Sequence, residues 1–283
     1  MMKHCLLSAG LLAVMSTSVW ADNIDFNTAV TIGPTQAPDT WYTDRYAPNI
    51  FLGNQIAPDG RTGTLQEGIR TEDAQVSQGG TRGGSFTSDF YNTQGRKYDL
   101  SSGVTSAFIE LYVPTSWDTL NQDVVAAEGR LGSFWATATD NSNAITAFPI
   151  IEFNNNRDLS GDDGFRIWDG LGWIDVAGFV GYDQWYDIGI IINGSQFDFY
   201  VNGVLVHTDA AIGGSTQLAN IILQGYNAGD SYDIFWDDLR PDGAPLMVAP
   251  VPEPASLAIW GVGGLGMLIG ARRRRKRQRT QAA

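Results

Sequence analysis

The stretch that decides the fold runs from Gln184 to Thr208 and reads QWYDIGIIINGSQFDFYVNGVLVHT. Apolar and polar residues alternate through most of it, as they do in strands that bury one face. Asn193-Gly194 and Asn202-Gly203 interrupt the alternation, and Asn-Gly between alternating segments is a strong signal for a tight hairpin turn. The stretch therefore predicts a three-stranded antiparallel meander. Its expected strands are 184–192, 195–201 and 204–208.

Similar alternation outside this stretch predicts further strands. They are 104–113, 131–138, 146–153, 218–224 and 231–239. Residues 22–250 are rich in Gly, Asn, Asp, Thr and aromatic residues, a composition that disfavours helix and favours short strands joined by turns. We expect an all-β domain over residues 22–245, built as an antiparallel two-sheet jelly-roll sandwich.

Two segments of the second half carry a resemblance to a known superfamily. FDFYVNGVLV and NIILQGYNAGDSYDIFWDDLR resemble the closing half of the concanavalin A-like jelly roll, the architecture of laminin-G domains, lectins and glucanases. The likeness covers residues 164–240, and it extends to residues 26–160 only through composition and strand spacing. It implies that the last strand pairs near the N-terminus. It implies no particular function, because one fold serves many.

Both ends of the chain have the features of targeting segments. Residues 1–21 combine Lys3, an apolar stretch and a small-residue cleavage site at Ala21, which predicts a secretory signal peptide. Residues 246–254 form a linker that ends in Pro252-Glu253-Pro254. The uncharged residues 255–271 predict a short transmembrane helix, and the basic residues 272–283 predict a cytoplasmic tail.

The order of motif, apolar run and basic tail resembles the PEP-CTERM sorting signal of Gram-negative bacteria. That resemblance implies processing by signal peptidase and by an exosortase-like enzyme. It also implies export through the inner membrane and transient anchoring there, before release to the cell surface or extracellular matrix. The simpler interpretation is an ordinary C-terminal membrane anchor.

The charge of the exported body limits its partners. Residues 22–250 contain 10 Lys+Arg and 30 Asp+Glu, so their net charge is about −20 (10 minus 30). Such a surface repels nucleic acid and anionic lipid, and it suits a neutral polymer, a basic partner or calcium. The only cysteine is Cys5, within the expected signal peptide, and His207 is the only histidine after it. Zinc sites and histidine-centred triads are therefore not expected.

Trp168, Asp169 and Trp173 are the candidate carbohydrate-binding residues. The rings of Trp can stack on the apolar face of a sugar, and a carboxylate can bind its hydroxyl groups. Both tryptophans flank a turn that could lie on the surface. The alternative is that these rings fill the core of the sandwich.

A nearby loop is the candidate metal site. Asn154, Asn156, Asp158, Asp162 and Asp163 supply the oxygen ligands that calcium prefers. The EF-hand pattern is absent, and a polar turn is the alternative. No other cofactor is expected.

No catalytic residues are predicted. Glycoside hydrolases of the superfamily carry Glu-x-Asp-x-x-Glu on one strand, and the body does not contain this motif. Glu110 and Glu152 lie on expected strands and could face each other. We expect a protein that is not an enzyme and that binds carbohydrate of an exopolysaccharide layer. The alternatives are a structural matrix protein without a specific ligand, and a divergent glycoside hydrolase or polysaccharide lyase.

Overall fold

A computed structural model of the chain describes most of the expected sandwich domain. The described ranges are 23–70, 89–120, 129–155, 163–210, 213–227 and 230–246. The expected signal peptide, the Pro-Glu-Pro motif, the apolar run and the basic tail lie outside them. All named strands belong to one compact unit. Within the described ranges, no helix is long and apolar enough to cross a membrane.

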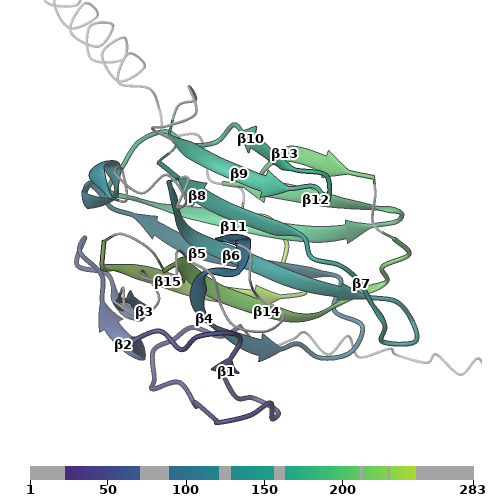
Figure 1. Cartoon of the computed structure of the whole chain (residues 1–283), viewed down its shortest axis with the longest axis horizontal. Coiled ribbons are helices and arrows are strands. Elements are labelled where there is room, and N and C mark those ends of the chain that lie inside the picture. The colour runs from purple at the N-terminus through teal and green to yellow at the C-terminus, as the bar shows by residue number, and fades with distance from the viewer. Residues whose placement is uncertain are drawn as a thin grey trace, which may run out of the picture. The chain divides into compact units, whose positions relative to one another are not determined.

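The strands form two antiparallel sheets (Figure 1). The eight-stranded sheet has the order β1 (Tyr42–Thr43), β4 (Thr93–Asp99), β14 (Gln217–Tyr226), β6 (Arg130–Thr139), β8 (Ile150–Asn154), β9 (Gly164–Trp168) and β10 (Trp173–Val176), and β7 (Ile145–Ala147) pairs with β6. The seven-stranded sheet has the order β13 (Val204–Asp209), β12 (Gln196–Val201), β11 (Gln184–Asn193), β5 (Ser106–Val113), β15 (Tyr232–Pro241), β3 (Thr62–Ile69) and β2 (Ile50–Ile56). Two short 3-10 helices are η1 (Asp89–Tyr91) and η2 (Thr115–Thr119).

One hydrophobic core lies between the two sheets. On β5 the alternate residues Ala107, Ile109 and Leu111 are fully buried in it. Phe134 of β6 and Phe165 of β9 enter the same core from the other sheet. The period-two pattern of the strands therefore buries one face of each sheet, and the expected all-β sandwich is confirmed.

The expected meander is confirmed as β11, β12 and β13, with one difference in its turns. Asn202 and Gly203 both have positive φ (50° and 76°), as a type I′ turn requires. In the first hairpin Asn193 pairs with Gln196, so the two central residues are Gly194 and Ser195. Gly194 has φ 64° and Ser195 does not have a positive φ, which is the type II′ pattern. Glycine serves both turns, at different positions.

The expected strands 104–113, 131–138, 218–224 and 231–239 correspond to β5, β6, β14 and β15, whereas β1 to β4, β9 and β10 were not predicted. One further difference lies near Pro149. The single expected strand 146–153 is divided into β7 and β8 there, since proline cannot donate a ladder hydrogen bond. The return of the last strand toward the N-terminus is confirmed, because Leu239 of β15 forms an antiparallel bridge with Ile24.

Candidate functional site

Aromatic side chains gather on the outer face of the eight-stranded sheet, the face turned away from the core. Trp135 of β6 is buried there beside Ile150 and Ile222, and Phe90, Trp168 and Trp173 pack over this cluster. The ring centre of Phe90 lies 5.3 Å from that of Trp135 and 5.2 Å from that of Trp168. The helix η1 thus places Phe90 against aromatic side chains of β6, β9 and β10, which are all distant from Phe90 in the sequence.

Beside this cluster the surface is hollowed into a groove of about 570 Å³, which we call the aromatic groove. Its aromatic lining is Phe90, Tyr91, Trp135, Phe148 and Trp168, and its charged lining is Asp44, Arg45 and Lys97. Ile145 and Phe148 are about half exposed at the groove (60% and 46%). A groove of this volume, mainly apolar with a few polar groups, is typical of a site for a small ligand or part of a polymer.

The charged groups of the aromatic groove are held in fixed positions. Asp44 pairs with Arg45 at 2.7 Å and with Lys97 at 3.2 Å. Arg45 also donates hydrogen bonds to Thr93 and Gln224, each at 3.2 Å. Its guanidinium carbon lies 4.9 Å from the ring centre of Tyr91 and 5.0 Å from that of Trp135. Arg45 is therefore both an ion-pair partner and part of the groove wall.

Several polar atoms of β6 and β14 are buried on this face without a hydrogen-bond partner among the residues that the structure describes. They are Trp135 Nε1, Thr137 Oγ1, Asn220 Oδ1 and Gln224 Nε2. Leaving such an atom unsatisfied costs about 1–3 kcal/mol. Of these four residues only Trp135 lines the aromatic groove.

A buried ionic centre lies on the same face. Glu152 of β8 is fully buried, and its carboxylate accepts hydrogen bonds from Arg166 at 2.8 Å, Arg130 at 3.2 Å and Ser133 at 2.6 Å. Burial alone would raise the pKa of Glu152, but the two arginines and Ser133 outweigh it, so the pKa lies below its usual value. Trp173 covers the centre, 4.3 Å from the guanidinium of Arg166. Glu152 is thus an enclosed carboxylate rather than a proton donor.

The structure separates the three predicted carbohydrate-binding residues. Trp168 lines the aromatic groove, whereas Trp173 packs behind it, 5.4 Å away between ring centres. Asp169 accepts hydrogen bonds from the backbone of Leu171 and Gly172, so its carboxylate closes the β9–β10 turn. Sequence analysis missed Trp135, Phe90 and Arg45, since nothing in their local pattern relates them to Trp168.

Most of the predicted calcium loop lies outside the described residues. Asn156, Asp158 and Asp162 fall in the range 156–162, of which nothing is described. Asn154 is buried at the end of β8, and Asp163 accepts a hydrogen bond from the Tyr182 hydroxyl at 2.6 Å. Within the described part of the chain, no three acidic, histidine or cysteine residues are grouped to hold a metal.

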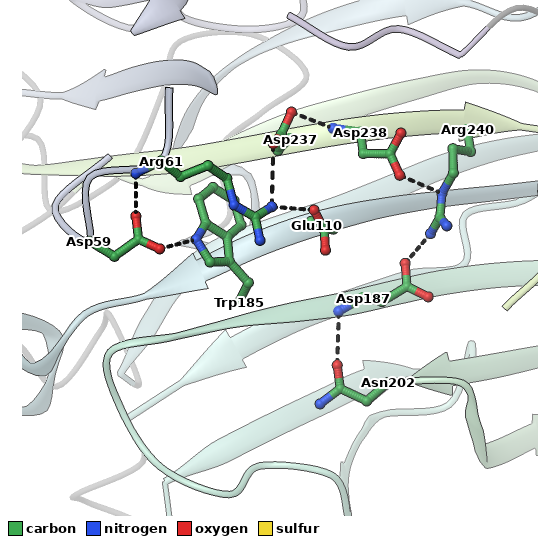
Figure 2. Close-up of polar contacts among 9 residues, drawn as sticks. All are labelled: Asp59, Arg61, Glu110, Trp185, Asp187, Asn202, Asp237, Asp238 and Arg240. Carbon is green, nitrogen blue, oxygen red and sulfur yellow. Dashed lines mark hydrogen bonds and ion pairs between the residues drawn. The ribbon is translucent and has the colours of Figure 1, made fainter. Parts of the chain in front are cut away.

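The outer face of the seven-stranded sheet carries a different cluster, shown in Figure 2. Asp187, Glu110 and Asp237 lie directly opposite one another on the adjacent strands β11, β5 and β15. Arg61 pairs with Glu110, and with Asp237 at 3.3 Å, while Arg240 pairs with Asp187. Glu110 and Glu152 therefore belong to different sheets and point away from each other, so they cannot form an acid/base pair.

Arg61 and Arg240 thus provide ion-pair partners for all three carboxylates of this row. Arg61 also covers the ring of Trp185 at 4.0 Å, and Asp59 accepts a hydrogen bond from Trp185 Nε1 at 2.7 Å (Figure 2). The turn that carries Asp59 and Arg61 is thereby fastened to the sheet. We regard this network as structural, and the aromatic groove is the candidate functional site.

Comparison with known proteins yields solved structures but no family. No protein-family model and no curated protein matches this sequence. A β-glucanase from Bacillus licheniformis is similar, with 12% identity and a TM-score of 0.40, over 71% of this chain and 91% of that one. The catalytic domain of a laminarinase from Thermotoga petrophila is 9% identical, with a TM-score of 0.41, over 78% and 96%. A carbohydrate-binding module from Bacillus subtilis is 11% identical, with a TM-score of 0.37, over 71% and 94%.

At these identities the likenesses concern the fold alone. They also correct one expectation. The expectation that the protein is not an enzyme is contradicted by this finding, because several of the similar structures are glycoside hydrolases.

Proposed function

We propose that the protein binds a polysaccharide in the aromatic groove. The observation that carries the proposal is that the rings of Trp168, Phe148 and Trp135 line one groove together with charged side chains that can hydrogen-bond a ligand. Sugars need this combination, since their C–H faces stack on aromatic rings and their hydroxyl groups need hydrogen bonds. The strands β6 and β9 hold Trp135 and Trp168, so this part of the site is preorganised for binding.

Replacing Trp168 by alanine is expected to weaken polysaccharide binding at least tenfold. The partly exposed ring lines the groove, and its loss removes the stacking surface, which corresponds to about 1.4 kcal/mol or more. Affinity electrophoresis of the purified full chain in gels containing polysaccharides measures the change. Trp185→Ala is the matched control, because Trp185 is a partly exposed tryptophan on the other sheet.

Thermal melts of both variants must show that the domain stays folded. A folded Trp168→Ala protein that binds as tightly as the wild type would refute the groove as the site. Failure of the wild type to bind any polysaccharide would favour a structural matrix protein without a specific ligand. Reducing ends and unsaturated products are measured in the same samples, so cleavage by a divergent hydrolase or lyase would be seen.

We further propose that the protein is exported and sorted to the cell surface or extracellular matrix of a Gram-negative bacterium. The support is the sequence alone: the signal peptide ending at Ala21, and Pro252-Glu253-Pro254 before an apolar run and a basic tail. Mass spectrometry of the surface protein should find no peptide from residues 272–283. Glu253→Ala should restore that peptide. Surface protein that always ends at Ala283 would contradict processing by an exosortase-like enzyme.

A further inference from the structure

The aromatic groove differs in charge from the body that carries it. Residues 22–250 contain three acidic residues for each basic one, 30 against 10. Four of those ten basic residues nevertheless gather on the outer face of the eight-stranded sheet. They are Arg45, Lys97, Arg130 and Arg166. Lys97 is the only lysine in residues 22–250, and it lines the groove.

Carboxylates near the groove neutralise only part of this charge. Asp44 is shared between Arg45 and Lys97, and Glu152 is shared between Arg130 and Arg166. Among the described residues that line the aromatic groove, two cations, Arg45 and Lys97, face one carboxylate, Asp44. Outside the groove, Asp99 accepts a hydrogen bond from the Tyr42 hydroxyl, and Asp175 of β10 lies directly opposite Arg166 in the strand register.

Arg45 is the more enclosed cation of the groove. Its side chain is 8% exposed, and this burial lowers the pKa of its guanidinium, whereas Asp44 and Tyr91 oppose the shift and Arg130 adds a smaller lowering. An added anion would favour the charged form of Arg45. The apolar walls would strengthen the attraction between this anion and the cations of the groove, because charges interact more strongly in a groove of low dielectric constant than in open water.

We propose that the ligand of the aromatic groove is an acidic polysaccharide, whose carboxylate or sulfate groups pair with Lys97 and Arg45 while a sugar ring stacks on Trp168. The proposal rests on the binding function proposed above and adds the chemical class of the ligand. Lys97 is the accessible cation, with 22% of its side chain exposed, whereas only 8% of the Arg45 side chain is exposed. Lys97 is therefore expected to make the first contact.

The test compares polymers that share a sugar backbone and differ in whether they carry charged groups. Polygalacturonate is compared with its methyl ester, and dextran sulfate with dextran, by affinity electrophoresis of the full chain at low and moderate salt. The charged member of at least one pair is expected to bind more than tenfold tighter, and to weaken as salt screens the charges. The first pair reports a carboxylate ligand and the second a sulfate ligand.

Lys97→Gln should weaken binding of the charged polymer about tenfold and reduce its salt dependence. Arg61→Gln removes a cation from the other sheet, so it alters the net charge by the same amount as Lys97→Gln. It should change neither the affinity for the charged polymer nor the salt dependence of binding. Equal affinity for the charged and neutral members, with binding still dependent on Trp168, would overturn this proposal and leave polysaccharide binding intact. If the wild type shows no polysaccharide binding that depends on Trp168, the proposed function itself is overturned, and this proposal with it.

Discussion

Replacing Glu152 by alanine is expected to lower the free energy of unfolding by about 3–5 kcal/mol. The change leaves Arg130 and Arg166 buried together without their shared carboxylate, each with only 3% of its side chain exposed. Removal of one member of a buried ion pair is costly because the remaining charge has lost both water and its partner. For a domain of this size the melting temperature should fall by roughly 6–20 °C.

Glu110→Ala is the matched control for this prediction. It removes the same side chain from a strand of the other sheet, where 20% of the Glu110 side chain and 33% of Arg61 are exposed. A partly exposed ion pair contributes about 1 kcal/mol or less. Thermal and urea unfolding of both variants would compare the two sites. Equal destabilisation by the two substitutions would contradict the central role of the buried ionic centre.

Acid should destabilise the wild type through the same centre. The pKa of Glu152 is lower in the folded than in the unfolded protein, so the stability it supplies is present above its ordinary value of 4.5. That stability is lost as the pH falls through the folded pKa. The Glu152→Ala variant lacks this contribution and should lose less stability on acidification.

Replacing Glu67 by glutamine is expected to stabilise the protein at neutral pH by about 3 kcal/mol. Glu67 points from β3 into the core and is fully buried, and its Oε2 accepts a hydrogen bond from Trp236 Nε1 at 3.0 Å. Burial raises its pKa to about 8, although Trp236 and Arg96 oppose the shift. Glutamine can accept the same hydrogen bond without a charge.

The direction of the pH dependence follows from this raised pKa. Between 4.5, the ordinary value, and about 8, the unfolded protein has an ionised Glu67 and the folded protein a protonated one. The contribution of Glu67 to stability is thus fully present below pH 4.5 and is lost as the pH rises toward 8. The advantage of Glu67→Gln should grow by about 1.4 kcal/mol per pH unit in this window and then level off. Urea titrations from pH 5 to 9 would measure it, and an advantage independent of pH would contradict it.

Local pattern in the sequence was sufficient for much of the fold. The alternation in 184–208 and the two Asn-Gly pairs predicted β11, β12 and β13, because strand period and turn chemistry are properties of adjacent residues. The exact turn register at Gly194 was not predicted, since a shift of one residue changes no local composition. The strands β1 to β4, β9 and β10 were not predicted. In β3 and β4 polar residues such as Glu67, Thr93 and Gln94 are buried, so the alternation of apolar residues is incomplete there.

The candidate site was decided by the tertiary structure. Trp168 was recognised from its sequence neighbours, but Arg45, Phe90 and Trp135 meet it only because β4, β14, β6, β8 and β9 lie side by side. Glu110 and Glu152 looked equivalent as strand residues, yet they lie on opposite faces of the sandwich. No pattern within one strand relates residues that are dozens of positions apart.

Charge shows the same division between sequence and structure. The composition of residues 22–250 determined a strongly acidic body, and by itself it suggested a neutral polymer, a basic partner or calcium. Only the fold gathers Arg45, Lys97, Arg130 and Arg166 onto one sheet face with Asp44 and Glu152 between them. A net charge is a sum over the chain, whereas a ligand responds to the charges within a few ångströms, and it is tertiary packing that selects those.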